Sequence, residues 1–182
     1  MEQLRQRERR RQGRPPEPSA GSVDSQSIKT ATQGTAVGFD GNKKVKGRKR
    51  HLLVDPLGLI LAVVVTSAGA DDRVGLMAVV ESYWATGVKR LRKLWVDGPY
   101  RGTLVTWVAE HLWFILQPVL CCDDRKGFVV VPRRWVVERT FAWLTQCRRL
   151  SKDDERLSAS SEAMISIAMT RLMLRRLATA SS

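Results

Sequence analysis

The sequence has few cysteines, no long apolar run and no apolar leader, and each shortage excludes a class of protein. Cys121 and Cys122 are adjacent and Cys147 stands apart, which matches neither a disulfide framework nor a zinc-ligand spacing. No apolar run approaches the roughly 18 residues that a membrane-spanning helix needs. The N-terminus also lacks the apolar stretch of a signal peptide. We therefore expect a cytoplasmic protein with no membrane partner.

Acidic residues are also scarce relative to basic ones. The 182-residue chain carries 31 Lys and Arg against 18 Asp and Glu, which gives a net charge of +13. Such an excess does not determine the fold, but it makes a polyanion the first candidate partner. Because 43% of the residues are apolar, the chain can still bury a core, and its length predicts one domain with appendages.

The composition changes near residue 20. Residues 1–20 carry six arginines and three glutamates, followed by a break rich in proline and glycine. We predict that this segment is a basic flexible N-terminal arm, either disordered or a short frayed helix. Residues 21–182 are predicted to form the folded domain, including a C-terminal helix.

Apolar periodicity predicts a series of strands and helices in this domain. A turn sequence at residues 55–58, DPLG, is flanked by β-branched runs and predicts a hairpin. In chain order, the predicted elements are a strand at 23–25, hairpin strands at 52–54 and 59–65, a helix beginning at Asp71 or Asp72, a strand at 93–96, a helix over 103–112, strands within 113–120 and 127–132, a helix from 133 or 134 to 147, and a helix over 161–177.

This order of elements predicts an α/β fold. Three strands followed by alternating strands and helices indicate a mixed sheet, antiparallel over the first three strands and then parallel, flanked by helices. The apolar residues expected on the core face of the helix that begins near Asp71 include Val74, Met77, Ala78 and Trp84. Those of the last helix are Met164, Ile167, Ala168 and Leu172.

An unusual glutamate lies in residues 132–143, PRRWVVERTFAW. On a helical wheel Glu138 falls between Phe141 and Ala142, close to the Trp135 face and away from a broad solvated surface. An ion pair with Arg134 would contribute only about 0.3 kcal/mol. The alternative is a partly buried carboxylate, which needs partners or a metal ion.

Two other carboxylates stand at positions suited to a site. Asp97 ends the apolar strand LWV and opens a turn, and ligands of α/β proteins gather at the carboxyl ends of strands. An Asp-Gly turn without further role is the ordinary alternative. Asp24 follows Val23 in a strand-like segment, where an Asx turn is the alternative.

Basic residues are concentrated in two places. In residues 43–50, KKVKGRKR, alternate side chains share one face of a strand and suit a phosphate backbone, although a charged strand edge is the alternative. Around Glu138, further arginines extend the positive surface, whereas Trp135 and Trp143 are expected in the core. The predicted DNA-binding residues in these two places are Lys44, Lys46, Arg48, Arg50, Arg133, Arg134 and Arg139.

Taken together, these stretches resemble the DDE transposases of bacterial insertion sequences, in the subgroup named after insertion sequence five. The resemblance spans nearly all of residues 21–177. The matching segments are VDSQSIKT, GFDGNKKVKGRKRHLLVDPLGL, LWVDGPYRG, GFVVVPRRWVVERTFAWL, RRLSKDDERL and SEAMISIAMTRLMLRRL.

The resemblance implies an RNase H-like fold of the retroviral-integrase superfamily. It places three catalytic acids, which are also the metal ligands, on Asp24, Asp97 and Glu138. The implied cofactor is a pair of Mg²⁺ ions, for which Mn²⁺ may substitute, with no small-molecule cofactor. The implied reaction is phosphodiester hydrolysis at element ends, followed by transfer of the 3′-hydroxyl into target DNA.

The resemblance also implies partners and leaves alternatives open. The expected partners are double-stranded DNA and a second copy of the chain, in the nucleoid. Relatives carry a basic residue seven positions after the glutamate, where this chain has Thr145; Arg148 and Arg149 lie nearby and could serve. Because the family's usual N-terminal recognition domain is missing, a frameshifted second reading frame, a decayed remnant that only binds DNA, or a nuclease without strand transfer are the alternatives.

Overall fold

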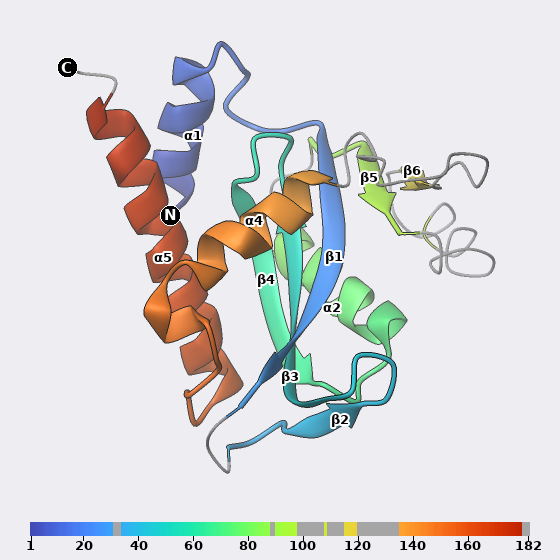
Figure 1. Ribbon diagram of the computed structural model, residues 1–182. Coiled ribbons are helices and arrows are strands. Elements are labelled where there is room, and N and C mark those ends of the chain that lie inside the picture. The colour runs from blue at the N-terminus through green and yellow to red at the C-terminus, as the bar shows by residue number, and fades with distance from the viewer. Residues whose placement is uncertain (31–33, 88–89, 98–107, 109–114, 120–134, 180–182) are drawn as a thin grey trace, which may run out of the picture.

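The computed structural model of this chain is built around one mixed sheet (Figure 1). It describes residues 1–30, 34–87, 90–97, 108, 115–119 and 135–179. The strands are β1 (Ala20–Lys29), β2 (Gly38–Asp40), β3 (Val45–Val54), β4 (Ile60–Ser67), β5 (Lys93–Val96) and β6 (Ile115–Pro118). Their order in the sheet is β2-β3-β1-β5-β6, and β4 also pairs with β3.

The directions of the strands confirm the predicted mixed sheet. β3 runs antiparallel to β1, β2 and β4, whereas β5 runs parallel to both β1 and β6. Strand β2 was not predicted, because its three residues are too few to show the alternation of apolar and polar residues that marks a strand.

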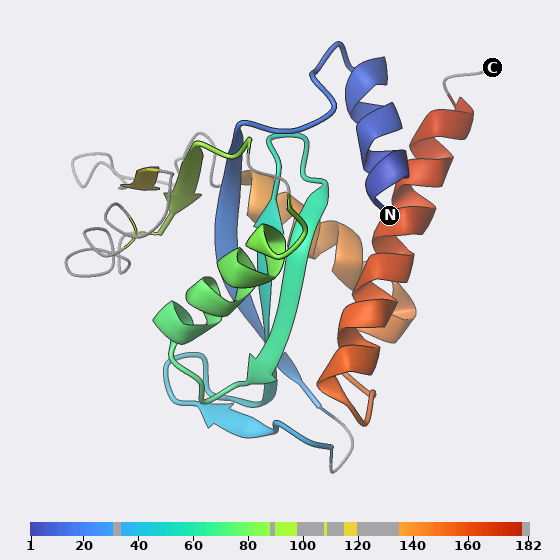
Figure 2. The ribbon, with the colours of Figure 1, turned by 180° about the vertical axis from the view of Figure 1, so that it is seen from behind.

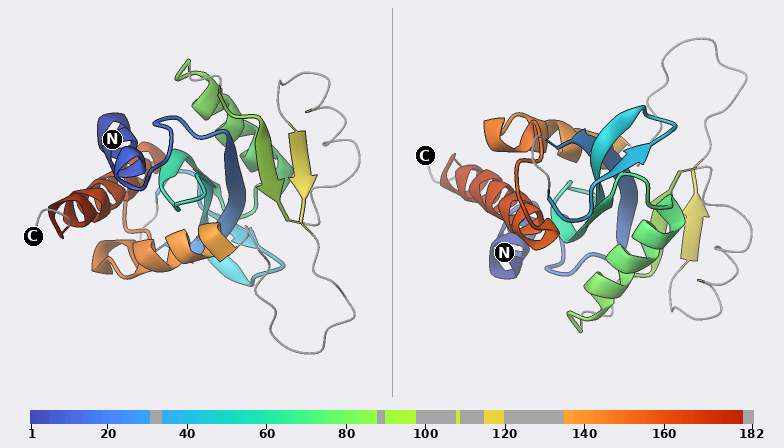
Figure 3. Two further views of the ribbon diagram at one scale, coloured as in Figure 1. Left: turned by 90° about the horizontal axis from the view of Figure 1, so that it is seen from above. Right: turned by 90° about the horizontal axis from the view of Figure 1, so that it is seen from below.

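Helices cover both faces of the sheet. These are α1 (Glu2–Arg11), α2 (Asp72–Trp84), α4 (Trp135–Thr145) and α5 (Ser158–Thr179), together with a short 3-10 helix, η1 (Arg148–Leu150). Helix α2 lies on one face, whereas α4 and α5 lie on the other, with α1 beside α5 (Figures 1 and 2). The views from above and below show the same layers edge-on (Figure 3).

The side chains of β3 alternate between two apolar cores. Leu53 packs in the core under α2, whereas Leu52 and Val54 pack in the core formed with α4 and α5. Even-numbered residues of β3 therefore face α4 and α5, and odd-numbered residues face α2. This alternation determines on which face each candidate residue lies.

The predicted basic arm is not free. Residues 2–11 form α1, in which the side chains of Arg5, Glu8 and Arg9 are buried. Arg9 forms a buried ion pair with Asp55 of the β3–β4 turn. Buried charges are tolerated when they are paired. Of the two alternatives predicted for this segment, residues 2–11 therefore form the helix, and they are packed against the domain instead of extending from it.

The predicted helices and strands are largely present, but two helices are rotated relative to the prediction. Val74 of α2 and Ile167 of α5, both expected in the core, are 61% and 59% exposed. Apolar residues surround much of each helix, so periodicity allows more than one buried face. The other predicted residues, except Ala78, are partly buried and pack against the two cores: Met77, Trp84, Met164, Ala168 and Leu172. The buried residues are Gly75, Leu76, Val79, Val80 and Tyr83 in α2, and Ser161, Ile165, Met169 and Met173 in α5.

Some predictions concern residues outside the described part of the chain. These are most of the helix over 103–112, the strand at 127–132, and the pair Cys121 and Cys122. Cys147 is a half-buried free thiol. Among the described residues, no helix combines the length and apolar character that crossing a membrane requires.

Candidate active site

Two of the predicted acids lie just beyond the paired part of the parallel strands β1 and β5. The β1–β5 pairs are Ala20 with Lys93, Gly21 with Leu94 and Ser22 with Trp95. Each pair is 73 positions apart, which is also the separation of Asp24 and Asp97. The paired stretch ends at Ser22 and Trp95, so Asp24 and Asp97 each lie two residues beyond its last pair.

The position of Asp24 is fixed by its strand partner. Asp24 pairs across the ladder with Leu52, whose side chain packs in the α4 and α5 core, so Asp24 faces α4. Val96, the last residue of β5, packs in the core under α2, and Asp97 follows directly after the strand. Half-buried in each case, the two acids lie at the edge of the core rather than inside it.

The third predicted acid is on the helix that crosses this face. Helix α4 contacts β1 and β3, and Val136 and Val137, which precede Glu138, are buried against the sheet. Glu138 itself is exposed, and Trp135 is 40% exposed. The expectation that Glu138 avoids a solvated face is therefore wrong, because the tryptophan beside it lies at the surface.

The described residues contain no group of three or more His, Cys, Asp or Glu side chains arranged to hold a metal ion. Asp24, Asp97 and Glu138 are all described, so the structure does not gather these three acids into such a group. Their chemistry does fit a hard divalent cation, which prefers carboxylate oxygens.

Two predicted DNA-binding arginines are buried and face the interior. Arg48 donates to Asp153 Oδ1 (3.1 Å) and to the carbonyl oxygens of Glu155 and Arg156 (2.7 Å each). Arg50 donates to the carbonyl oxygen of Leu150 (2.8 Å), and burial lowers the pKa of its guanidinium. Both side chains are 0% exposed, so the prediction that they bind DNA is wrong.

The other basic residues divide into exposed and engaged groups. Lys44 and Lys46 are exposed, although Lys44 precedes β3 in a left-handed turn conformation rather than sharing its ladder. Arg148 and Arg149 are exposed after α4, and Arg149 pairs with Glu155 at 2.9 Å. Arg133 and Arg134 lie outside the described residues.

Arg139 is held between two tryptophans of its own helix. Its guanidinium carbon lies 4.1 Å from the ring centre of Trp135 and 4.6 Å from that of Trp143. Arg176 of α5 stacks on Trp143 from 4.4 Å. Arg139 also donates to the carbonyl oxygen of Leu57 (3.2 Å), and burial lowers its pKa. This arginine is therefore part of the packing between α4 and the hairpin turn.

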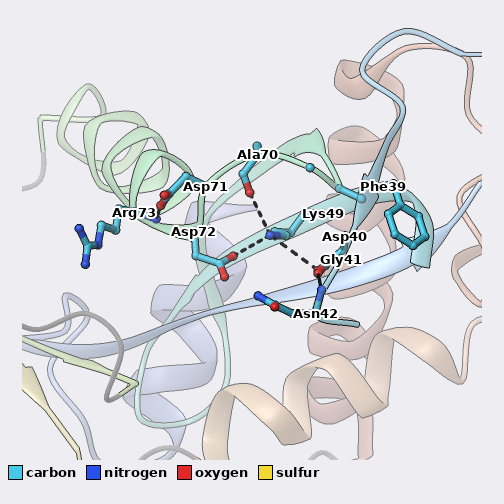
Figure 4. Close-up of a pocket in the computed structure, with 11 residues that line it drawn as sticks. Phe39, Asp40, Gly41, Asn42, Lys49, Ala70, Asp71, Asp72 and Arg73 are labelled. Carbon is cyan, nitrogen blue, oxygen red and sulfur yellow. Dashed lines mark hydrogen bonds and ion pairs between the residues drawn. The ribbon is translucent and has the colours of Figure 1, made fainter. Parts of the chain in front are cut away.

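A polar cavity of about 490 Å³ lies on the opposite face, between β2, Lys49 and the start of α2 (Figure 4). Lys49 Nζ donates to the carbonyl oxygen of Ala70 (2.9 Å) and pairs with Asp72 (3.1 Å) and Asp40 (3.8 Å). Ser25 also donates to Asp72. These charged groups satisfy one another, and the cavity is separated from the predicted acids by the sheet.

His51 is a buried residue of the same α2 face. Its Nε2 lies 2.9 Å from the hydroxyl of Thr66. Burial lowers the pKa of the imidazole to about 4, so it is neutral at pH 7. This is the arrangement expected of a satisfied histidine within a sheet, on the other face from the acids.

Comparison with known proteins identifies a family for most of this chain. The family model described as "Transposase DDE domain" matches residues 15–173, and no curated protein has a significantly similar sequence. The catalytic core domain of BIV integrase has 11% identity and a TM-score of 0.48, with 91% of this chain and all of that chain covered.

Two structures of Mos1 are also similar to this chain at 11% identity. The Mos1 strand transfer complex has a TM-score of 0.46 and the pre-cleavage Mos1 transpososome 0.39, and 96% of this chain is covered in both. The matches cover 60% and 61% of the Mos1 chains. Similarities this distant do not bear on activity. The strand order and the family match identify the fold as RNase H-like.

Proposed function

Because this chain belongs to the transposase DDE domain family, we propose that it is the catalytic domain of a DNA transposase of the insertion-sequence-five subgroup. It hydrolyses phosphodiesters at element ends and transfers the freed 3′-hydroxyl into target DNA. Its partners are double-stranded DNA and a second copy of the chain. The observation that supports the proposal is that Asp24 and Asp97 each lie two residues beyond the last pair of the parallel strands β1 and β5, where α4 contacts β1.

In this proposal, Asp24, Asp97 and Glu138 hold two Mg²⁺ ions, or Mn²⁺ in their place. When bound, such ions activate the attacking oxygen and stabilise the leaving oxygen of an in-line displacement. Asp24 lies within β1 and pairs with Leu52 of β3, which fixes its backbone. Asp97 follows the end of β5, and Glu138 completes the set from the helix above the same face.

The basic residues bind and orient the DNA. Lys44 and Lys46 are exposed at the start of β3 and suit contacts with phosphates, which position DNA without reading its sequence. Arg148 and Arg149 provide a second exposed pair after α4. Arg133 and Arg134 precede Glu138 in the sequence, and Arg134 is proposed to hold a phosphate or to orient that glutamate.

The test is cleavage and joining of labelled duplex DNA, taken from the regions that flank the coding sequence, in the presence of Mg²⁺ or Mn²⁺. Asp24→Asn, Asp97→Asn and Glu138→Gln should each lower the cleavage rate by about a thousandfold, because each removes several kcal/mol of transition-state stabilisation. Binding of the same DNA should remain, since phosphate contacts supply non-specific affinity. Asp154→Asn, an exposed acid outside the proposed site, is the matched control.

Full cleavage activity in any of the three variants would remove that acid from the proposed site. Cleavage without joining would identify a nuclease, and DNA binding without either reaction would identify a remnant. Analytical sedimentation of the chain, with and without DNA ends, tests the proposed dimer. A complex that holds two DNA ends but only one copy of the chain would contradict it.

A further inference from the structure

The β3–β4 turn is a tightly bonded unit at residues 55–58. Asp55 is completely buried. Its Oδ1 accepts hydrogen bonds from the backbone N–H groups of Leu57 (2.9 Å) and Leu59 (2.8 Å). Its carbonyl oxygen accepts the N–H of Gly58 (2.9 Å), which has a φ of +80°. One carboxylate thus determines the shape of the whole turn.

The turn is bonded to the two residues that directly follow Glu138. The carbonyl oxygen of Leu57 accepts a hydrogen bond from Arg139. The buried hydroxyl of Thr140 shares its proton between the carbonyl oxygens of Gly58 in the turn (3.0 Å) and Val136 in its own helix (2.9 Å). A Cβ at Gly58 would come within 2.8 Å of both Thr140 Oγ1 and the Trp143 ring. The contact is therefore close enough to set the position and rotation of this part of α4.

The other side of the turn is bonded to α1. Arg9 Nη1 forms a buried ion pair with Asp55 Oδ2, the carboxylate oxygen that the turn itself does not use. Arg9 Nε donates to the carbonyl oxygen of Pro15 (2.8 Å), which fixes the guanidinium. Arg9 is 5% exposed, so it is not available to a DNA phosphate. Helix α1 precedes the residues that the family model matches.

We propose that Arg9, Asp55 and Thr140 are positioning residues for Glu138. The path runs from α1 through the buried Arg9–Asp55 pair to the turn, and from the Gly58 carbonyl through Thr140 to the helix that carries the glutamate. Helix α1 thereby contributes to the position of Glu138 in the catalytic domain. This inference rests on the proposed function, because it requires Glu138 to be a metal ligand.

The test is Mn²⁺ binding to the full chain without DNA, measured by isothermal titration calorimetry. Thr140→Val removes the hydroxyl and keeps the side-chain shape, and Arg9→Gln removes the ion pair. Each should weaken Mn²⁺ binding by about tenfold, as loss of an outer-shell partner does in other metal sites. Thr140→Ser, which keeps the hydroxyl, should restore binding. Arg10→Gln makes the same charge change at an exposed position of α1 and should have no effect.

Double variants distinguish positioning from general loss of stability. If the path acts through Glu138, Thr140→Val should weaken Mn²⁺ binding no further in a chain that already carries Glu138→Gln. Thermal unfolding of each variant shows whether it is folded at the temperature of the titration. If Arg9→Gln does not fold, the Mn²⁺ affinities of Arg9→Lys and Thr140→Val are compared with that of the parent chain instead.

Two results overturn different claims. Unchanged Mn²⁺ affinity in folded Thr140→Val and Arg9→Gln, with weakened affinity in Glu138→Gln, would overturn the positioning role and leave the proposed function standing. Unchanged affinity in Glu138→Gln would overturn the assignment of Glu138 as a ligand, and with it the inference. Equal weakening by Thr140→Val with and without Glu138 present would assign the effect to stability alone.

Discussion

His51 is a buried histidine whose charge state affects the stability of the fold. Its imidazole lies under Gly75 of α2, and its pKa is lowered from 6.5 to about 4 by burial. Above pH 6.5 the ring is neutral in both the folded and unfolded chain. Between pH 6.5 and 4 the unfolded chain binds a proton that the folded chain does not, so acid favours unfolding.

We therefore predict that the free energy of unfolding falls by about 3 kcal/mol between pH 6.5 and pH 4 because of this residue alone. Urea denaturation at a series of pH values measures it. His51→Gln should show a shallower pH dependence over this interval, whatever its stability at pH 7. Parallel curves for the two proteins would mean that His51 is protonated in the folded chain.

Gly75 provides a second prediction at the scale of one residue. Alanine in a helix is favoured over glycine by about 1 kcal/mol. A Cβ at Gly75, however, would overlap the His51 ring, and overpacking a core costs about 1–3 kcal/mol. Gly75→Ala should therefore lower the melting temperature, and a rise would show that the histidine moves aside without cost.

At the scale of elements, Arg48 joins β3 to the segment between η1 and α5. Its partner Asp153 is 1% exposed and also accepts a hydrogen bond from Ser161 at 2.6 Å. Removing one member of a buried ion pair costs about 3–5 kcal/mol. Asp153→Asn should lower the free energy of unfolding by this amount in a denaturation experiment. Lys46→Gln, an exposed change on β3, should alter stability by less than about 0.5 kcal/mol.

The elements differ in how far the sequence could predict them. The DPLG turn gave the β3–β4 hairpin, and the apolar run before Asp97 gave β5 at residues 93–96, because local turn chemistry and β-branched residues act over short distances. The rotation of α2 and α5 could not be predicted, since it depends on which residues the sheet presents. The burial of α1 depends on Asp55, more than forty positions away.

The same limit applies to the candidate site. Asp97 could be proposed from a strand end, and it does follow β5 directly, whereas Asp24 lies within β1 and was proposed from the resemblance. The alternation in KKVKGRKR correctly placed Arg48 and Arg50 on one face of β3. It could not predict which helices cover that face. Arg48 pairs with Asp153, and Arg50 donates to the carbonyl oxygen of Leu150. Because these partners are distant in the sequence, the pattern could not show that both arginines are buried and stabilise the fold. Asp55 and Thr140 carried no local signal of their role.

At the scale of the whole molecule, the net charge of +13 predicts DNA binding that weakens steeply with salt. The logarithm of the binding constant should fall linearly with the logarithm of salt concentration. Lys46→Gln should reduce this slope by about one, as expected for one phosphate contact, in a fluorescence anisotropy titration with duplex DNA. A slope equal to that of the parent chain would place Lys46 outside the interface.

The central claim is that Asp24, Asp97 and Glu138 together bind divalent cations. The most direct measurement is a crystal structure of the chain soaked with Mn²⁺, with the ions located by their anomalous scattering. The account predicts anomalous density bonded to carboxylate oxygens of Asp24, Asp97 and Glu138 together. Mn²⁺ bound elsewhere, with these three side chains directed apart, would contradict it.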